Sequence, residues 1–309
     1  MRNAFASTLT KIAQTDQRIV LLSGDIGNKL FDSFKEQCPG RFFNCGVAEA
    51  NMTSMAAGMA LCGLRPVTYT IASFVTVRCL EQIRIDVCYH NLPVIIVGVG
   101  AGLSYAELGA THHSCEDIAM MRVLPNMTVI CPADSFEVRA ALRAALKHNG
   151  PVYIRLGKKG EPIVHGGIPE FVIGKGIIVR DGKDVCLLST GNILSTVMEA
   201  AEMLQERDIS ARVVSFHTVK PLDAELLSQV FAQFRMVVSI EEHSILGGFG
   251  SSIAEWLVGK GKTVGELVCM GAADTFFCEA GKQKDARRYF SLTPETIAKN
   301  TMEAFFKKS

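Results

Sequence analysis

The sequence has no long hydrophobic run and no strong charge of either sign. Its longest apolar stretch, LPVIIVGVGAGL, is far shorter than the ~20 residues that a membrane-spanning helix needs. The formal net charge of the 309 residues is only +1. Nucleic acids and anionic membranes attract strongly basic surfaces, so we expect neither a nucleic-acid partner nor a membrane association.

The first residues also lack the apolar centre of a signal peptide. The segment MRNAFASTLTKIAQTDQR is polar, and its Phe5, Leu9 and Ile12 instead share one face of a helix. The sequence therefore predicts a cytoplasmic location.

No CxxC pair occurs among the ten cysteines. Most of them lie within apolar runs such as VCLLST, ELVCMG and VICPAD. A free cysteine packs as a small hydrophobic residue, whereas zinc sites need closely spaced ligands and disulfide scaffolds belong to small secreted chains. We expect reduced, mostly buried thiols and no metal ligand in this chain.

Short β-branched runs alternate with helical patterns along the chain, which is 48% hydrophobic and 20% charged. Most of these runs are continuously apolar, which is typical of parallel strands that are buried on both faces. The expected strands are 19–25, 66–71, 93–99, 127–133, 151–156, 185–190, 211–216, 236–241 and 266–271, and the clearest helices are 48–61, 134–148, 192–207, 250–258 and 294–307. The sequence predicts the α/β class, with two open, mostly parallel sheets flanked by helices.

One segment breaks this alternation. KKGEPIVHGGIPEFVIGKG is rich in glycine and proline, and its short hydrophobic pieces form no clear element. We therefore expect one domain over 1–157, a linker over 158–177 and a second domain over 178–309.

Glu49 is the first candidate for a functional residue. It follows a short strand that ends at Cys45-Gly46, it opens a helix of small residues, and no other charged residue lies between Arg41 and Arg65. A carboxylate in a first helical turn can simply complement the helix dipole. A carboxylate in apolar surroundings is, however, costly to bury, which points to a functional site.

The run GVAEANMTSMAAGMALCGLRPV resembles the segment around the cofactor-activating glutamate of thiamine-diphosphate enzymes of the transketolase family. In that family the glutamate hydrogen-bonds N1′ of the cofactor's aminopyrimidine, which favours the imino tautomer that serves as the internal base. The resemblance implies that Glu49 is both a catalytic and a cofactor-binding residue.

The segment TIASFVTVRCLEQIRIDVCYHNLPVIIVG is similar to the family's wall of the aminopyrimidine ring. The resemblance places Phe74 at the aromatic position that packs on the ring, and Arg78 at the start of the following helix, beside the cofactor. Many relatives carry tyrosine where this chain has Leu80. An ordinary core aromatic and a helix-end ion pair are the alternative interpretations of Phe74 and Arg78.

A third segment, THHSCEDIAMMRVLPNMTVICPAD, resembles the family's substrate loop and the helix after it. The resemblance implies that His112 acts beside the reacting carbon, where imidazole can pass a proton, and that His113 lies near the substrate. Three basic residues match positions that relatives use near a phosphate tail, although surface ion pairing explains them equally well: Arg122, Arg155 and Lys158.

Two positions depart from the sugar-utilising transketolases. Those enzymes carry an acidic residue and a further histidine where this chain has Leu108 and Gly100. Both polar contacts to substrate hydroxyls would then be missing, which puts the ordinary ketose-phosphate exchange in doubt.

Residues 189–223 and 239–257 resemble the transketolase C-terminal domain, so the resemblance covers nearly the whole chain. The Gly-Asp-Gly motif with which the family holds the diphosphate and Mg²⁺ (or Ca²⁺ or Mn²⁺) does not occur. We therefore expect a partner, an N-terminal transketolase subunit that carries this motif and binds most of the thiamine diphosphate and metal, in an α2β2 assembly acting on a sugar or sugar phosphate.

Three alternatives remain at this point. The β subunit of a 2-oxo-acid dehydrogenase E1 shares this layout, and a carboligase similar to 1-deoxyxylulose-phosphate synthase is another enzyme option. A non-catalytic scaffold subunit with the same fold is the third, and Glu49 argues against it.

Overall fold

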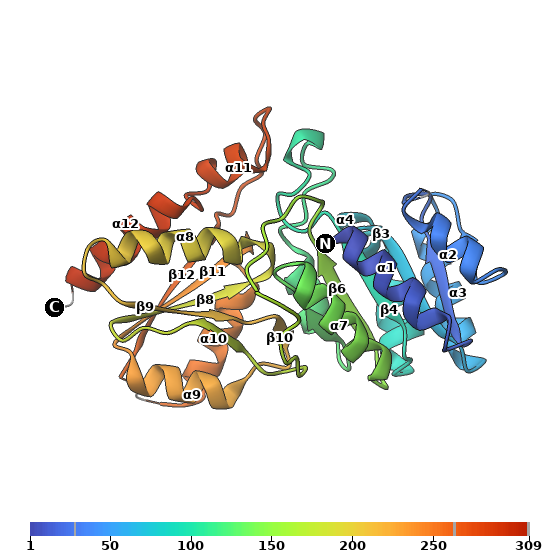
Figure 1. Ribbon diagram of the computed structural model, residues 1–309, viewed down its shortest axis with the longest axis horizontal. Helices are drawn as coiled ribbons and strands as arrows, with labels where there is room; N and C mark the ends of the chain where they lie inside the picture. Colours follow the sequence, from blue (N-terminus) through green and yellow to red (C-terminus); the bar gives the residue numbers. More distant parts are fainter. Residues whose placement is uncertain (28, 262–263, 308–309) are drawn as a thin grey trace.

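The computed structural model describes residues 1–27, 29–261 and 264–307. These residues form two α/β halves that lie side by side, one running from blue to green in Figure 1 and the other from yellow to red. Continuously buried strands lie at the centre of each half, as the apolar runs predict. The predicted fold class is confirmed.

The first sheet has seven strands among the described residues, in the order β10-β5-β6-β4-β3-β1-β2. All neighbouring strands are parallel except the pair of β10 and β5. The strands are β1 (Ile19–Ser23), β2 (Phe42–Asn44), β3 (Arg65–Ile71), β4 (Ile95–Val99), β5 (Thr128–Ile130), β6 (Val152–Leu156) and β10 (Thr218–Lys220).

Helices cover both faces of this sheet. One face packs against α1 (Arg2–Ala13), η1 (Lys29–Phe31), α2 (Asp32–Gln37) and α7 (Ser135–Lys147). The other packs against α3 (Glu49–Leu61), α4 (Ala72–Val77), α5 (Leu80–Gln82), the π-helical η2 (Ile83–Tyr89) and α6 (Asp117–Val123). A short η3 (Ala106–Leu108) lies in the long loop between β4 and α6.

The second sheet has the order β12-β11-β8-β9-β7, with only β7 antiparallel to its neighbour. Its strands are β7 (Ile177–Arg180), β8 (Val185–Thr190), β9 (Ala211–Ser215), β11 (Met236–Ser244) and β12 (Glu266–Ala272). In Figure 1, α8 and α12 lie on one side of it and α9 and α10 on the other. The helical segments of this half are η4 (Gly191–Ile193), α8 (Leu194–Gln205), α9 (Ala224–Gln233), α10 (Phe249–Val258), α11 (Gln283–Tyr289) and α12 (Pro294–Phe306).

Strand β10 lies in the second half of the sequence but pairs with β5 at the edge of the first sheet. One cluster of buried side chains also extends from the first half into the second, for example from Ile96 and Val129 to Phe216 and Phe249. The two halves therefore share backbone pairing as well as a hydrophobic core.

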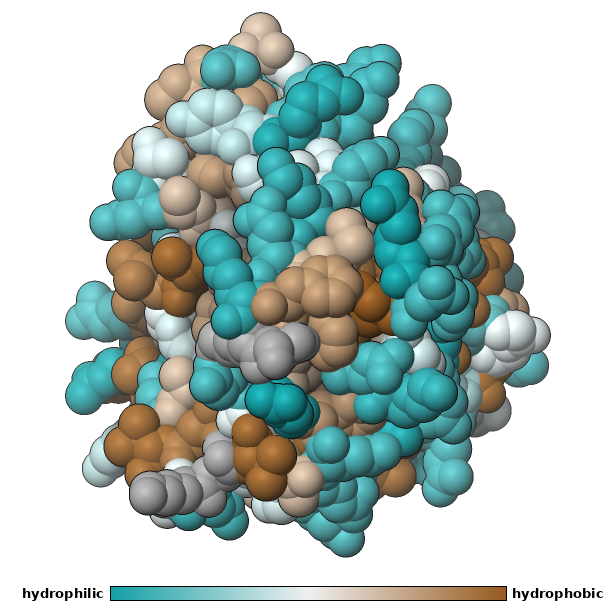
Figure 2. All heavy atoms as spheres, turned by 90° about the vertical axis from the view of Figure 1, so that its left-hand side faces the viewer, coloured by the Kyte–Doolittle hydropathy of each residue, from teal (hydrophilic) through white to brown (hydrophobic). Residues whose placement is uncertain are grey.

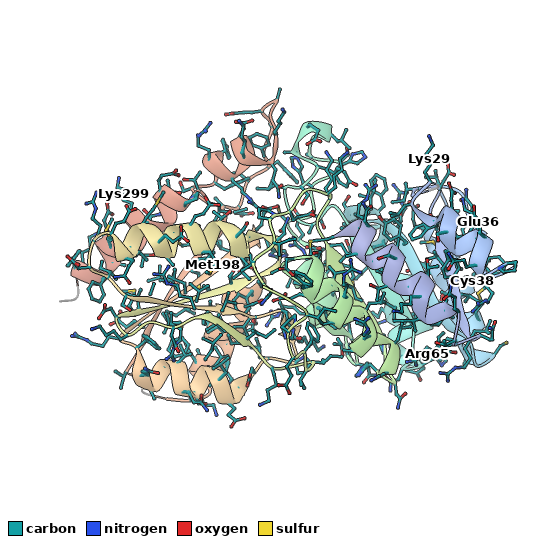
Figure 3. The ribbon with its side chains drawn as sticks, viewed as in Figure 1. Lys29, Glu36, Cys38, Arg65, Met198 and Lys299 are labelled. Atoms are coloured by element: carbon teal, nitrogen blue, oxygen red, sulfur yellow. The ribbon has the colours of Figure 1, made fainter. Side chains whose placement is uncertain are left out.

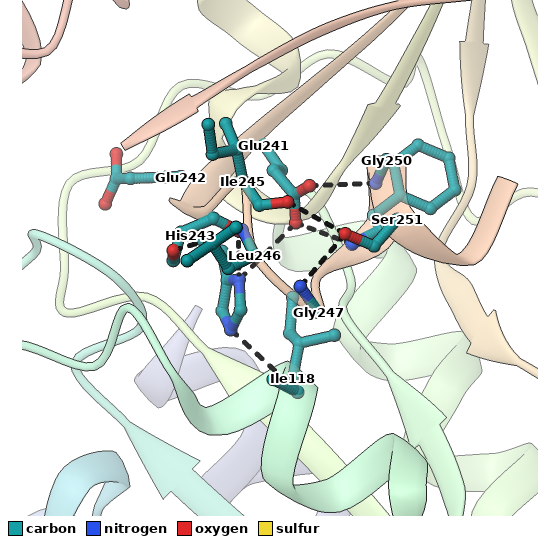
Figure 4. Close-up of polar contacts among 12 residues, drawn as sticks. Ile118, Glu241, Glu242, His243, Ile245, Leu246, Gly247, Gly250 and Ser251 are labelled. Carbon is teal, nitrogen blue, oxygen red and sulfur yellow. Dashed lines mark hydrogen bonds and ion pairs between the residues drawn. The ribbon is translucent and has the colours of Figure 1, made fainter. Parts of the chain in front are cut away.

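The motif EEHSILGGFG turns β11 into α10. Figure 4 shows Glu241 accepting hydrogen bonds at the start of this helix, from the backbone N–H groups of Phe249 (2.7 Å) and Gly250 (2.8 Å). A Cβ atom at Gly248 would lie 2.2 Å from Glu241 Oε2, so a side chain at this position would displace the carboxylate. Burial raises the pKa of Glu241 to about 7. The motif thus builds a strand-to-helix turn.

Figure 2 views the end of the second half. Hydrophilic side chains separate the apolar patches on this face. Val258 and Phe306 are among the exposed apolar residues of the second half. Among the described residues, no helix is both long and apolar enough to cross a bilayer. Six of the ten cysteines are buried, whereas Cys62, Cys269 and Cys278 are exposed.

His217 is fully buried, and its burial leads us to expect that the free energy of unfolding falls in acid. Its ring stacks on Phe171 with 3.7 Å between centroids, its Nδ1 lies 2.9 Å from Thr218 Oγ1, and its Nε2 has no partner among the described residues. Burial lowers the pKa of His217 from 6.5 to about 4.

Between these two pKa values the unfolded chain binds a proton that the folded chain does not, so the free energy of unfolding falls as the pH drops from 6.5 towards 4. We expect His217 to cost roughly 2 kcal/mol between pH 7 and pH 5. Urea unfolding at both pH values should show a pH-dependent loss smaller by this amount in His217→Leu. Equal losses in the two proteins would contradict the prediction.

Candidate active site

Glu49 is the first residue of α3 and is only 1% exposed. It lies just after β2, at the carboxyl end of the first sheet, where functional residues of open α/β folds gather. Its Oε2 accepts a hydrogen bond from Arg78 Nη1 at 2.6 Å. Its Oε1 accepts only a long one, 3.4 Å, from Thr70 Oγ1, among the described residues.

The expectation that Glu49 is a lone carboxylate is corrected by the ion pair with Arg78. Arg78 comes from the end of α4, 29 positions along the chain, so the local sequence around Glu49 does not reveal it. Its side chain is 45% exposed, so the pair joins a buried carboxylate to a guanidinium that water reaches. The cost of burying Glu49 is therefore partly compensated within this chain.

Phe74 lies beside the same arginine. The Arg78 guanidinium carbon is 4.5 Å from the centre of the Phe74 ring, a cation–π distance. The His112 ring lies on another side, 5.1 Å from Phe74 between centroids. The structure thus brings Glu49, Arg78, Phe74 and His112 into one cluster, and Arg78 contacts both groups that the resemblance assigns to the aminopyrimidine.

His112 lies in the loop between β4 and α6. Its Nδ1 is 2.9 Å from Thr111 Oγ1, and Ser73 Oγ donates to the Thr111 carbonyl at 3.1 Å, which ties this loop to α4. His113, by contrast, is buried: its Nε2 is 3.5 Å from the Ala106 carbonyl. Burial lowers the pKa of His113. His112 is therefore the more accessible member of the pair, since it is only half-buried.

Tyr105 is a neighbour of His112 that the sequence did not reveal. Gly100 adopts a φ of +90°, and a Cβ atom built there would lie 2.1 Å from the Tyr105 ring. The ring thus fills the space that any side chain at position 100 would need, and it lies 6.3 Å from the His112 ring. Leu108 is half-exposed on η3 nearby. The only hint in the sequence is the glycine itself.

Arg155 lies on β6 and is almost completely buried. Its Nε binds both carboxylate oxygens of Asp117, at 3.0 and 2.8 Å, and its Nη2 donates to the carbonyls of Ser114 and Glu242. Because Glu242 belongs to β11, this guanidinium joins the two halves of the chain. Its contacts are structural ones within the described residues.

Arg122 and Lys158 are less buried. Arg122 pairs with Glu255 of α10 and donates to the Gly247 carbonyl at 3.2 Å, away from the Glu49 cluster. Lys158 pairs with Glu107, and its Nζ lies 5.1 Å from the centre of the Tyr105 ring. Of the three basic candidates, only Lys158 lies next to the residues around His112.

The described residues contain no group of three or more metal-binding side chains. The candidate site of this chain consists of the Glu49 carboxylate, the rings of Phe74, Tyr105 and His112, and nearby cations. Several large apolar side chains are exposed on α3, α4 and η2 or just before α3: Val47, Met55, Leu61, Val77, Ile85 and Tyr89.

Comparison with known families gives two matches that follow one another along the chain. Residues 1–161 match the model of the transketolase pyrimidine binding domain, and residues 174–297 match that of the transketolase C-terminal domain. The first match ends at residue 161 and the second begins at residue 174.

Similar proteins extend the match to the full length. The chain is 37% identical to a 6-deoxy-6-sulfo-D-fructose transketolase subunit of Clostridium sp. strain MSTE9, covering 100% of this chain and 95% of the relative. It is 35% identical to a 1-deoxy-D-xylulose-5-phosphate synthase of Microcystis aeruginosa, covering 98% of this chain but only 48% of the relative.

A solved structure described as a split-gene transketolase in an inactive β4 tetramer matches with a TM-score of 0.90 and 36% identity. The match covers 99% of this chain and 98% of that one. The matches in fold, in domain order and over the full length agree with one another, and the chain belongs to the transketolase family.

Proposed function

We propose that this chain is one subunit of a split transketolase-type enzyme, a thiamine-diphosphate-dependent transferase that moves a two-carbon ketol unit. The observation that carries the proposal is the cluster of Glu49, Phe74 and His112 at the carboxyl end of the first sheet. Full-length similarity to a transketolase subunit supports it, since the relative named as a 1-deoxy-D-xylulose-5-phosphate synthase is about twice as long as this chain.

The residues fit the pyrimidine half of thiamine diphosphate. The buried Glu49 Oε1 has a single long hydrogen bond among the described residues, so it has capacity to share a proton with N1′ of the ring. Phe74 offers an aromatic surface nearby. Arg78 now packs on the Phe74 ring and binds Glu49 Oε2, so it would have to shift when the pyrimidine ring binds, or contact both residues together with the ring. When bound, the cofactor would supply an acidic ring carbon that, once it has lost its proton, can add to a ketose carbonyl.

Within this arrangement each residue of the chain has a distinct task. Glu49 holds a proton at N1′, and Phe74 orients the ring by packing against it. His112 moves a proton at the substrate oxygen, because an imidazole can both accept and donate one. Lys158 is our candidate for contact with the anionic end of a substrate.

The partner that we propose is an N-terminal transketolase subunit, which would bind the diphosphate and Mg²⁺, in an α2β2 assembly. Two features of this chain support a shared site. Arg78, which binds Glu49, is partly exposed, and apolar side chains next to these two residues in the chain, Val47 and Val77, are exposed. In addition, the similar split-gene transketolase is described as inactive in its β4 form.

The substrate pair is the experimental test of this proposal. With Tyr105 filling the space above Gly100 and apolar Leu108 half-exposed, we expect the assembled enzyme to use xylulose 5-phosphate and ribose 5-phosphate less well than another pair. Co-expressed subunits should be screened with ketose phosphates, sulfonated ketoses and 2-oxo acids as donors.

Each outcome of the screen has a clear meaning. Sedoheptulose 7-phosphate formation with kcat/KM of roughly 10⁴ M⁻¹s⁻¹ or more would contradict the substrate prediction. Pyruvate as the preferred donor would replace ketol transfer by a synthase or dehydrogenase activity. Turnover of no donor, with both subunits folded and assembled, would favour the scaffold alternative.

A further inference from the structure

The amino ends of the strands of the first sheet lie opposite the carboxyl end that holds Glu49. Strands β1 and β3 begin there, and a cavity of about 500 Å³ opens between them and the ends of α1 and α7. Figure 3 labels Arg65 at this lower edge of the first half. The volume is within the roughly 300–1,000 Å³ typical of small-molecule sites.

The cavity concentrates positive charge. Its lining includes the side chains of Arg18, Arg65, Arg143 and Lys147 but only one carboxylate, that of Asp16. The Asp16 carboxylate is already bound by Arg18, at 3.0 and 2.8 Å. The lining thus carries an excess of three positive charges, in a chain whose formal net charge is +1.

Three of these cations have no carboxylate partner. Among the described residues, Arg65, Arg143 and Lys147 form no ion pair, although Arg143 Nη1 donates to a backbone carbonyl at 3.5 Å. An anion in the cavity would therefore meet charges that are available to it, rather than displace existing ion pairs.

Arg65 is the buried member of this group, with only 8% of its surface exposed. Its Nη2 donates to the carbonyls of Leu146 and His148 at the end of α7, but its Nε has no partner among the described residues. Burial lowers the pKa of Arg65, and the charge of Arg18 lowers it further, while Asp16 opposes them. A buried guanidinium in a positive field is stabilised by a nearby anion.

Compensation of helix dipoles explains only part of this arrangement. Lys147 lies in the last turn of α7, where a cation is favourable, and Arg65 binds the last carbonyls of that helix. Dipole compensation does not require Arg143, one turn earlier, or the open space between the cations. Nor does it require the apolar walls formed by Ile12 and Leu146.

We propose that this cavity binds a small organic anion, with its charged group near Arg65, Arg143 and Lys147 and its apolar part against Ile12 and Leu146. The ligand is of the organophosphate or carboxylate class. Because the cavity lies at the amino ends of the strands and Glu49 lies at their carboxyl ends, this ligand does not compete with the substrate. The inference is independent of the proposed transferase function.

Phenyl phosphate is a suitable probe, because it joins an aromatic ring to a dianion. We expect calorimetry on the full chain to show saturable binding, weaker for benzoate, and weaker again for inorganic phosphate and for phenol, which each lack one part. The double variant Arg143→Ala/Lys147→Ala should raise the dissociation constant of phenyl phosphate at least tenfold. Both residues are exposed, so the fold should persist, which circular dichroism can check.

The matched control is Arg207→Ala/Lys284→Ala, which removes two exposed cations from the second half of the chain. It should leave the dissociation constant unchanged. Equal weakening in both double variants would reduce the effect to net charge and overturn the site. The absence of saturable binding of phenyl phosphate to the wild-type chain would overturn it as well.

Discussion

Replacing Glu49 by glutamine is expected to lower turnover of the assembled enzyme by roughly 10²–10⁴-fold, the usual worth of a general acid–base group. Glutamine has nearly the same shape and can still hydrogen-bond, but it cannot exchange a proton with N1′. The direct readout is exchange of the cofactor's C2 proton, followed by NMR. Exchange at the wild-type rate in Glu49→Gln would show that the residue has been misassigned.

The same substitution should leave folding and assembly nearly unchanged. Removing one charge from a buried ion pair is costly when the other charge stays buried and unpaired. Here the remaining charge belongs to Arg78, which is 45% exposed and can be hydrated. If Glu49 only complemented the N-terminus of α3, the substitution would cost some tenths of a kcal/mol and leave activity almost whole.

A matched control separates charge from chemistry. Glu36→Gln makes the same change at an exposed position on α2, labelled in Figure 3. It should retain full turnover and the wild-type exchange rate. A loss of activity in both variants would indicate a general effect of charge rather than a proton held at N1′.

The strands could be predicted because burial on both faces leaves a clear signal in a single sequence. The run VCLLST, for example, forms β8 over Val185–Thr190, and every residue of it is buried. The antiparallel edge strands β7 and β10 gave no such signal, since they are short and β7 is only partly buried. Pairing of β10 with the first sheet depends on how the two halves pack, which no local pattern encodes.

The candidate site was predicted from motifs, which named candidate residues but not the partners that those residues have in the fold. Glu49, Phe74 and His112 do cluster, but the pairing of Glu49 with Arg78 and the Tyr105 ring above Gly100 arise only in the folded chain. The sequence likewise did not reveal the partners of Arg155, which we interpreted as one of the possible phosphate ligands. A lone arginine at the end of a strand looks available in sequence, whereas here Asp117 and two carbonyls surround it.

The second large effect that we expect is weak cofactor binding by the lone subunit. Without its partner, this chain should bind thiamine diphosphate and Mg²⁺ at least roughly 100-fold more weakly than the assembled enzyme, about 2.7 kcal/mol. Binding of a diphosphate and its metal requires oxygen ligands and backbone amides close together. The sequence has no Gly-Asp-Gly, and the described residues hold no cluster of metal-binding side chains.

The state of the glutamate cluster strengthens this expectation. In this chain Arg78 binds Glu49 and covers Phe74, so a lone pyrimidine ring would have to displace a cation without gaining any contact to its diphosphate. Calorimetry of the chain alone and of the co-purified pair measures the difference, and light scattering identifies the assembly present in each sample. Micromolar affinity of the lone chain would end the idea of a shared site. Weak binding alone and tight binding in the pair would locate the missing ligands in the partner.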